Sequence, residues 1–124
     1  MTLLNKENIV TTMLEVIPEI RPQYEKELEW WDEGLPHIVF GDVLNPYIIN
    51  LLKTDKKEEV LERIFDFLEH MANSNNIYVQ EVLVTTVLER LGDEKAVLKK
   101  AKELYMGEQT KRLSDDIEKA IGRG

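Results

Sequence analysis

The chain has 124 residues, 43% of them hydrophobic and 32% charged, so it is long enough for one hydrophobic core and too short for two. Twenty-four acidic residues against sixteen basic ones give a formal net charge of −8. This charge disfavours nucleic acid and anionic membranes as partners, because phosphate contacts need a positive surface. The absence of cysteine excludes disulfides, thiolate nucleophiles and cysteine-ligated metal centres, and it agrees with a reducing compartment.

No segment has the pattern of an export signal or a membrane span. The apolar residues at 1–4 are interrupted at once by polar ones, so no basic region precedes a continuous apolar run. The longest apolar stretch, 43–52, contains Asn45, Pro46 and Asn50 and is far shorter than the ~20 residues that cross a bilayer. We therefore expect one cytoplasmic domain that spans 1–124.

Apolar residues recur at three- and four-residue spacing along most of the chain, which predicts an all-α bundle of about six or seven helices. Asn5 is expected to cap a first helix, which ends at the prolines of 18–22. Pro22 suits the first turn of a second helix that stops at Gly34. On this second helix Tyr24, Leu28 and Trp31 are predicted to face the core.

The segment 35–40 is equally compatible with a helical turn and with an extended connector. Gly41 and Asp42 are expected to open a helix through about Lys53, with Pro46 in its first turn. Asp55 followed by Glu58 resembles a capping box and predicts a helix that continues to Ala72.

The segment 77–91 predicts a helix that is apolar nearly all round, which is typical of a central, buried helix. Its main polar stripe is Glu81, Thr85 and Glu89, and we expect these side chains to pair with Lys or Arg of a neighbour or to face a cleft. Asp93 is predicted to cap the following helix, which ends near 107. Ser114 is predicted to begin a last short helix that ends at Gly122.

Residues 64–71 show a faint similarity to 84–91, at an offset of twenty positions. Consecutive helices of similar length with short polar connections are also found in HEAT or armadillo-like helix pairs. A plain irregular bundle is the stronger expectation, because two amphipathic helices can often be aligned in this way.

No catalytic or cofactor-binding motif is present: the chain has no glycine-rich phosphate loop, no Gly-x-Ser-x-Gly, no His-Glu-x-x-His and no calcium loop. We expect no cofactor and no metal, and we expect acidic pairs such as Glu62 with Asp66, or Glu25 with Glu29, to be solvated. His37 is predicted to bond to backbone in a connector, and His70 to lie on a solvated surface.

The candidate binding site is an acidic segment with two tryptophans, YEKELEWWDE at 24–33. An aromatic side chain among carboxylates is typical of a surface that docks a basic partner. Trp30 can instead pack against Ile38 or Phe40, and we slightly favour that position. The predicted partner-binding residues are Glu27, Glu29, Trp30, Trp31, Asp32 and Glu33.

The sequence WWDEGLPHIVFGDVLNPYIINLL at 30–52, with 67–71 and 87–91, resembles a loosely defined family of small uncharacterised helical bacterial proteins. In size, acidity and helical layout the chain is also similar to immunity proteins of bacterial toxin systems. The resemblance implies an interaction protein of the bacterial cytosol, and it transfers no active-site residue.

We therefore expect a non-enzymatic protein-binding module, most concretely an immunity protein that neutralises a cognate, basic toxin domain. The first alternative is a helical-repeat adaptor or scaffold with an unrelated role. The second is a hydrolase whose site is assembled from Glu81, Glu89 and His37. The sequence leaves the oligomeric state open.

Overall fold

The computed structural model describes residues 3–29 and 35–123, and these residues form helices joined by short turns, without a strand. Counted as uninterrupted helical segments, the described residues contain seven helices, which confirms the expected all-α bundle. In chain order they are α1 (Ile9–Val16); the 3-10 turn η1 (Pro18–Ile20) with α2 (Arg21–Leu28); α3 (Pro36–Val39), the π-helical η2 (Phe40–Leu44) and α4 (Asn45–Thr54); α5 (Glu58–Ala72); α6 (Ile77–Glu81), the π-helical η3 (Val82–Leu88) and α7 (Glu89–Leu91); α8 (Lys95–Leu104); and α9 (Glu108–Ala120).

The chain enters α1 through a reciprocal pair of asparagines. The backbone N–H of Asn8 donates to Asn5 Oδ1 at 2.9 Å, and the N–H of Asn5 donates to Asn8 Oδ1 at 2.8 Å. This arrangement satisfies two backbone donors at once, as in a capping box, but in the turn that precedes α1; the residue at the N-cap of α1 is Asn8, not the expected Asn5. As predicted, the first helix ends before Pro18, which begins η1.

The open segment 35–40 is helical. A helix begins at Pro36 and continues through η2 and α4 to Thr54, so the expected start at Gly41 is five residues too late. Pro46 therefore lies inside a continuous helix and not in its first turn. Proline has no N–H to donate to the preceding turn, and the wider π-helical turn of η2 directly before Pro46 accommodates this loss.

Helix α5 begins at Glu58, later than a cap at Asp55 predicts, and the expected capping box does not form. Asp55 ends α4 with a left-handed φ of 55°, and its carboxylate pairs with Lys100. Lys57, also at φ 55°, precedes α5, and no side chain caps the helix there. Local spacing predicted that the Asp55 carboxylate caps α5, but it pairs instead with Lys100, a cation distant in sequence.

The helix at 77–91 is central, as predicted. It packs against α3, η2, α4, α5, α8 and α9, and Leu83, Val87, Leu88 and Leu91 are fully buried. Ile77 is the exception on its apolar face, since it is 75% exposed at the first helical residue.

Asp93 does not cap α8, which begins at Lys95 after Glu94 and has no side-chain cap. The Asp93 carboxylate instead accepts a hydrogen bond from Arg123 Nη1 at 2.6 Å. The prediction of this cap is therefore wrong for the same reason as at Asp55: a charged partner distant in sequence competes for the carboxylate.

Helix α9 begins at Glu108, six residues before the predicted start, and Ser114 is buried in its middle. Its cap comes from α5. Glu69 accepts hydrogen bonds from the backbone N–H of Gln109 at 3.1 Å and of Thr110 at 2.8 Å, and from the Thr110 hydroxyl at 2.7 Å. Gly107 permits this approach, because a Cβ there would lie 2.5 Å from Glu69 Cδ.

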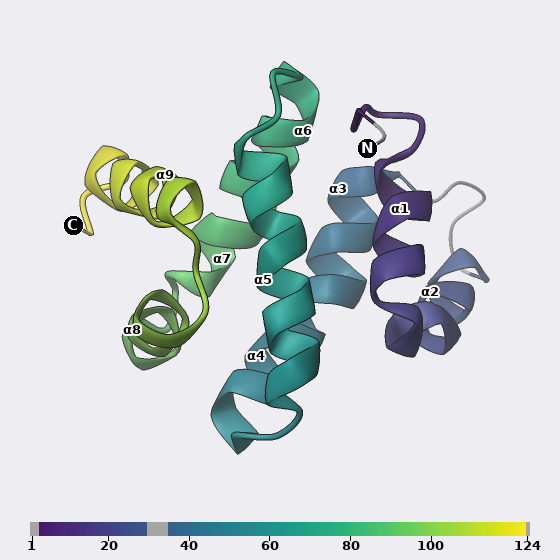
Figure 1. Ribbon diagram of the computed structural model, residues 1–124, viewed down its shortest axis with the longest axis horizontal. Helices are drawn as coiled ribbons and strands as arrows, with labels where there is room; N and C mark the ends of the chain where they lie inside the picture. Colours follow the sequence, from purple (N-terminus) through teal and green to yellow (C-terminus); the bar gives the residue numbers. More distant parts are fainter. Residues whose placement is uncertain (1–2, 30–34, 124) are drawn as a thin grey trace.

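Figure 1 shows how the helices are arranged: α5 runs through the middle of the molecule, with α8 and α9 on one side and α1, α2 and α3 on the other. One continuous core joins these helices, and α2 contributes no buried residue to it. Within 3–29 and 35–123, no helix is both long and apolar enough to span a bilayer.

Candidate functional site

The predicted partner-binding residues lie at the C-terminal end of α2 and beyond it. Glu27 is half-buried near the end of the helix, and Glu29 is exposed at the residue where the helix stops. Outside the described residues lie Trp30, Trp31, Asp32 and Glu33. The expectations on the two indole side chains therefore stay predictions.

Helix α2 is the least buried of the long helical segments. None of its side chains is buried; Tyr24 is half-buried against the core, and Leu28 is 36% exposed. The prediction that Leu28 faces the core is therefore wrong. A helix with so few apolar residues has no stripe to bury, so α2 exposes the carboxylates of Glu25 and Glu29 to solvent.

A groove of about 280 Å³ lies beside α2, where η1 and α2 approach η2 and α4. Its lining contains two carboxylates, and none of the lining residues is basic. The lining residues are Glu19, Ile20, Gln23, Asp42, Val43, Pro46 and Tyr47. The groove therefore extends the acidic surface of α2 towards η2.

The two carboxylates of the groove differ in how strongly a nearby positive charge neutralises them. Glu19 pairs with Arg63, whose Nη1 also donates to the backbone oxygen of Val16 at 2.7 Å. The hydrogen bond from Arg63 lowers the pKa of Glu19 below its usual value, although burial acts in the opposite direction. Among the described residues Asp42 pairs only with Arg90, 3.9 Å away and half-exposed, and such exposed pairs are weak.

The Tyr47 hydroxyl adds a polar group to this groove. It is buried and makes no hydrogen bond to any described residue. Burial raises the pKa of Tyr47, and the negative charge of Glu19 raises it further, so the phenol stays protonated at neutral pH. A buried hydroxyl without a partner is uncommon, and its oxygen can accept a hydrogen bond from a ligand that enters the groove.

A second polar cluster joins α3 and α4 to the π-helical segment η3. His37 Nδ1 lies 2.6 Å from Thr86 Oγ1, and Asn45 Nδ2 donates to the backbone oxygen of Thr86 at 2.7 Å. Thr86 and Asn45 are buried, and Asn45 Oδ1 has no partner among the described residues. The prediction of a connector histidine bonded to backbone is wrong, because His37 lies on α3 and contacts a side-chain hydroxyl.

The sequence did not predict this cluster, because His37 and Asn45 lie 49 and 41 positions away from Thr86. The one available signal was Thr86 itself, a polar residue within the predicted central helix. π-helical turns occur frequently at functional sites, since they re-aim side chains that a regular helix would place elsewhere.

The stripe of Glu81, Thr85 and Glu89 faces solvent in large part. Glu81 and Thr85 are exposed, and the Thr85 hydroxyl donates to the backbone oxygen of Glu81 at 2.7 Å. In the described part of the chain, neither glutamate forms a salt bridge, so the expected pairing with Lys or Arg is wrong. No hydrogen bond joins His37 to either glutamate there, and the proposed hydrolase constellation is not assembled by such contacts.

The remaining predicted acidic pairs are exposed, as expected for solvated faces: Glu62 and Asp66 on α5, and Glu25 and Glu29 at α2. Across 3–29 and 35–123, no three His, Asp or Glu side chains converge closely enough to hold a metal ion. His70 is half-buried and lines a surface cavity with Asn73 and Asn5, so it is less solvated than predicted.

A family model described as a domain of unknown function (DUF7674) matches residues 10–122. No curated protein and no solved structure matches the chain. The matched range includes α2, the acidic groove and both π-helical segments, and it leaves out 1–9 and 123–124. Since the match covers most of its length, the chain belongs to the DUF7674 family.

Proposed function

We propose that this chain is a non-enzymatic protein-binding domain that recognises a basic partner through α2 and the adjoining groove. The observation that carries the proposal is that α2, an eight-residue helix, buries no side chain. Helices of globular domains normally bury one face, and that burial supplies most of their stability. Because α2 contributes no buried side chain to the core, its presence in the fold is explained if its exposed surface binds a partner.

The charge of this surface supports a basic partner. Residues 25–33 contain five acidic residues and one lysine, and the groove adds Glu19 and Asp42. A negative surface raises the local concentration of a positive partner and accelerates its association. The unpartnered Tyr47 hydroxyl and the carboxylate of Asp42 suit the head group of a lysine or arginine side chain that enters the groove.

The partner proposed is a bacterial toxin domain, which the chain neutralises in the cytosol. Support comes from the resemblance in size, acidity and helical layout to immunity proteins. A toxin that acts on nucleic acid needs a positive active site, and an acidic protein is suited to cover it. A toxin-like reading frame directly beside the gene would add support, and its absence would favour an adaptor of unrelated role.

The test compares two double variants with the same change in net charge. Glu25→Lys with Glu29→Lys reverses two exposed positions at α2, and Glu62→Lys with Asp66→Lys reverses two exposed positions on α5, also four residues apart. The full chain is used to isolate a basic protein from its host, and association rates are measured at about 50 and 300 mM salt. We expect the α2 variant to associate roughly tenfold or more slowly at low salt, while the α5 variant follows the wild type.

Equal association rates for the two variants would remove α2 from the interface. Inhibition of the isolated protein's toxic activity by the wild type, and weaker inhibition by the α2 variant, would support neutralisation. If binding depends on α2 but no activity is inhibited, the chain is an adaptor. A decalysine peptide serves as the control for unspecific attraction, which should weaken equally in both variants.

A further inference from the structure

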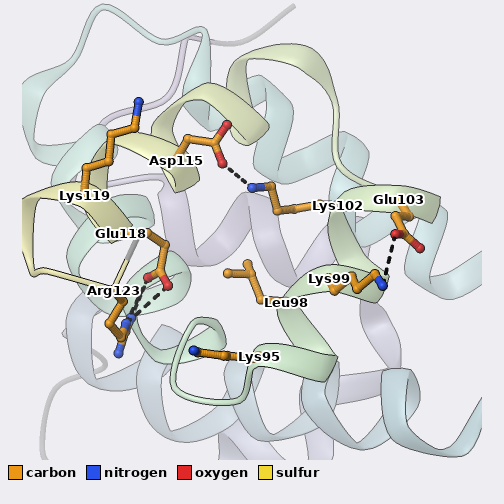
Figure 2. Close-up of a pocket in the computed structure, with 9 residues that line it drawn as sticks. All are labelled: Lys95, Leu98, Lys99, Lys102, Glu103, Asp115, Glu118, Lys119 and Arg123. Carbon is orange, nitrogen blue, oxygen red and sulfur yellow. Dashed lines mark hydrogen bonds and ion pairs between the residues drawn. The ribbon is translucent and has the colours of Figure 1, made fainter.

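A cavity of about 590 Å³ opens between α8 and α9, and its lining is unusual for so acidic a chain (Figure 2). The lining residues are Lys95, Leu98, Lys99, Lys102, Glu103, Asp115, Glu118, Lys119 and Arg123. Five of them are basic, although the whole chain has only sixteen Lys and Arg residues. The cavity is therefore a local concentration of positive charge.

The geometry of α8 places these cations along one face. Lys95, Lys99 and Lys102 follow each other at helical spacing, and Leu98 lies between them in sequence. Figure 2 shows the Leu98 side chain at the centre, between residues of α8 and residues of α9 and the C-terminal segment. The cavity thus combines a charged rim with one apolar contact.

The three carboxylates of the lining are already paired. Asp115 pairs with Lys102 of the opposite helix, Glu118 pairs with Arg123 at 2.6 Å, and Glu103 lies 4.0 Å from Lys99. Two cations are left: the side chains of Lys95 and Lys119 make no hydrogen bond or ion pair to any described residue. Two positive charges of the cavity are therefore uncompensated.

Arg123 is held in a fixed position at the edge of the cavity. Its guanidinium donates to Glu118, to Asp93 at 2.6 Å and to the backbone oxygen of Glu89 at 2.7 Å. These contacts occupy four of its five N–H groups, and the fifth, on Nη1, has no partner among the described residues. Glu118 is only 8% exposed, so the side chain that orients Arg123 is itself fixed by packing.

We propose that this cavity binds a small molecule with at least two negative charges, a phosphate ester or a polycarboxylate. Its anionic groups would contact Lys95 and Lys119 and the free N–H of Arg123, and an apolar part would lie on Leu98. The cavity volume is within the range of small-molecule sites. This site is independent of the proposed partner surface, because α2 and the α8 and α9 pair lie at opposite ends of the molecule (Figure 1).

The experiment is calorimetric titration of the full chain with tripolyphosphate and with citrate at about 20 mM salt. Lys95→Gln with Lys119→Gln removes the uncompensated cations. Lys111→Gln with Arg112→Gln is the matched control, since it removes two exposed charges of α9 outside the cavity. We expect the cavity variant to bind at least about tenfold more weakly than the wild type, and the control to stay within about twofold.

Tighter binding of tripolyphosphate than of citrate assigns the site to phosphate esters, and the reverse order assigns it to polycarboxylates. The proposal is overturned if neither probe binds, or if both variants weaken binding equally, which indicates general charge attraction. It is also overturned if sedimentation at the same salt shows a dimer of the wild type, and if this dimer is lost both in the cavity variant and in the double variant Glu25→Lys with Glu29→Lys. In that case the cavity accepts the acidic end of a second copy. Thermal unfolding checks that the variants fold, which we expect because the replaced side chains are exposed.

Discussion

At the scale of single residues, Glu69 stabilises the fold through a cap that no local pattern indicates. Burial raises its pKa, but the hydrogen bonds from Thr110, Gln109 and Asn73 outweigh burial, so the pKa lies below the usual 4.5. A carboxyl group with a lowered folded-state pKa stabilises the protein above its unfolded pKa, and this contribution is lost as the pH falls through the folded pKa.

We therefore predict that Glu69→Gln lowers the free energy of unfolding by about 1–2 kcal/mol at pH 7. The difference from the wild type should shrink as the pH falls below about 4.5, because the wild-type carboxylate is then protonated first in the unfolded chain and, at lower pH, in the folded protein. Urea unfolding at pH 7 and at about pH 3.5 measures both values. Glu62→Gln, an exposed change on the same helix, should have little effect at either pH. An equal loss at both pH values would contradict an ionised cap.

Capping is also where sequence reasoning was least successful, for one physical reason. Asp55, Asp93 and Ser114 each have suitable local spacing, but Asp55 pairs with Lys100, Asp93 pairs with Arg123, and Ser114 is buried within α9. A carboxylate near a helix start can cap it or can bind a distant cation, and only the tertiary structure decides between the two.

At the scale of helices, apolar periodicity predicted α5 and the 77–91 helix, which bury apolar faces, more accurately than α9, whose buried side chains are polar. The limits of the 77–91 helix and the end of α5 at Ala72 agree with prediction, because both helices have apolar stripes. Helix α9 was predicted too short, since its buried side chains are Thr110, Ser114 and Glu118. Periodicity also gave no sign of the π-helical segments η2 and η3, which pack against each other.

The contact between α3 and η3 leads to a prediction for Thr86. Thr86→Val keeps the shape of the side chain but removes the hydroxyl that meets His37, and it should cost about 0.5–1.5 kcal/mol of stability. In a His37→Ala background the same change should cost clearly less, because the partner is already absent. Chemical unfolding of the four proteins of this double-mutant cycle gives the coupling energy.

Thr85→Val is the matched control for this cycle. Thr85 is exposed, and its hydroxyl donates only to the backbone of its own helix, so the change should shift stability by no more than about 0.5 kcal/mol. If Thr86→Val costs no more than Thr85→Val, or if the Thr86 and His37 changes are additive, the contact does not tie the two helices together.

At the scale of the whole molecule, the net charge of −8 is distributed unevenly along the chain. Residues 1–94 carry nineteen acidic and eight basic residues, whereas 95–124 carry five acidic and eight basic ones. The sequence located the acidic helix from composition alone. The groove and the cationic cavity each combine side chains from different elements, and a linear pattern does not show which elements meet.

The part of the fold that supplies stability is also distinct from α2, the proposed recognition surface. Helix α2, at one end, buries no side chain, whereas the 77–91 helix is enclosed by helices from both halves of the chain (Figure 1). Opening the amides of 77–91 requires breaking contacts with α5, α8, α9 and the 36–54 helix at once, so it should occur only with global unfolding. Opening α2 exposes little apolar surface and should cost far less.

We therefore predict a gradient in native-state hydrogen exchange. Amides of 82–91 should exchange most slowly, with opening free energies equal to the global free energy of unfolding, those of α1 faster, and those of α2 fastest. Exchange followed by NMR at several low urea concentrations distinguishes the classes, because only global opening depends strongly on urea. Exchange of 82–91 at the rate of α1 would show that this helix is not the centre of the fold. Slow exchange throughout α2 would mean that contacts beyond its half-buried Tyr24 hold it, and the argument that α2 is left for a partner would then fail.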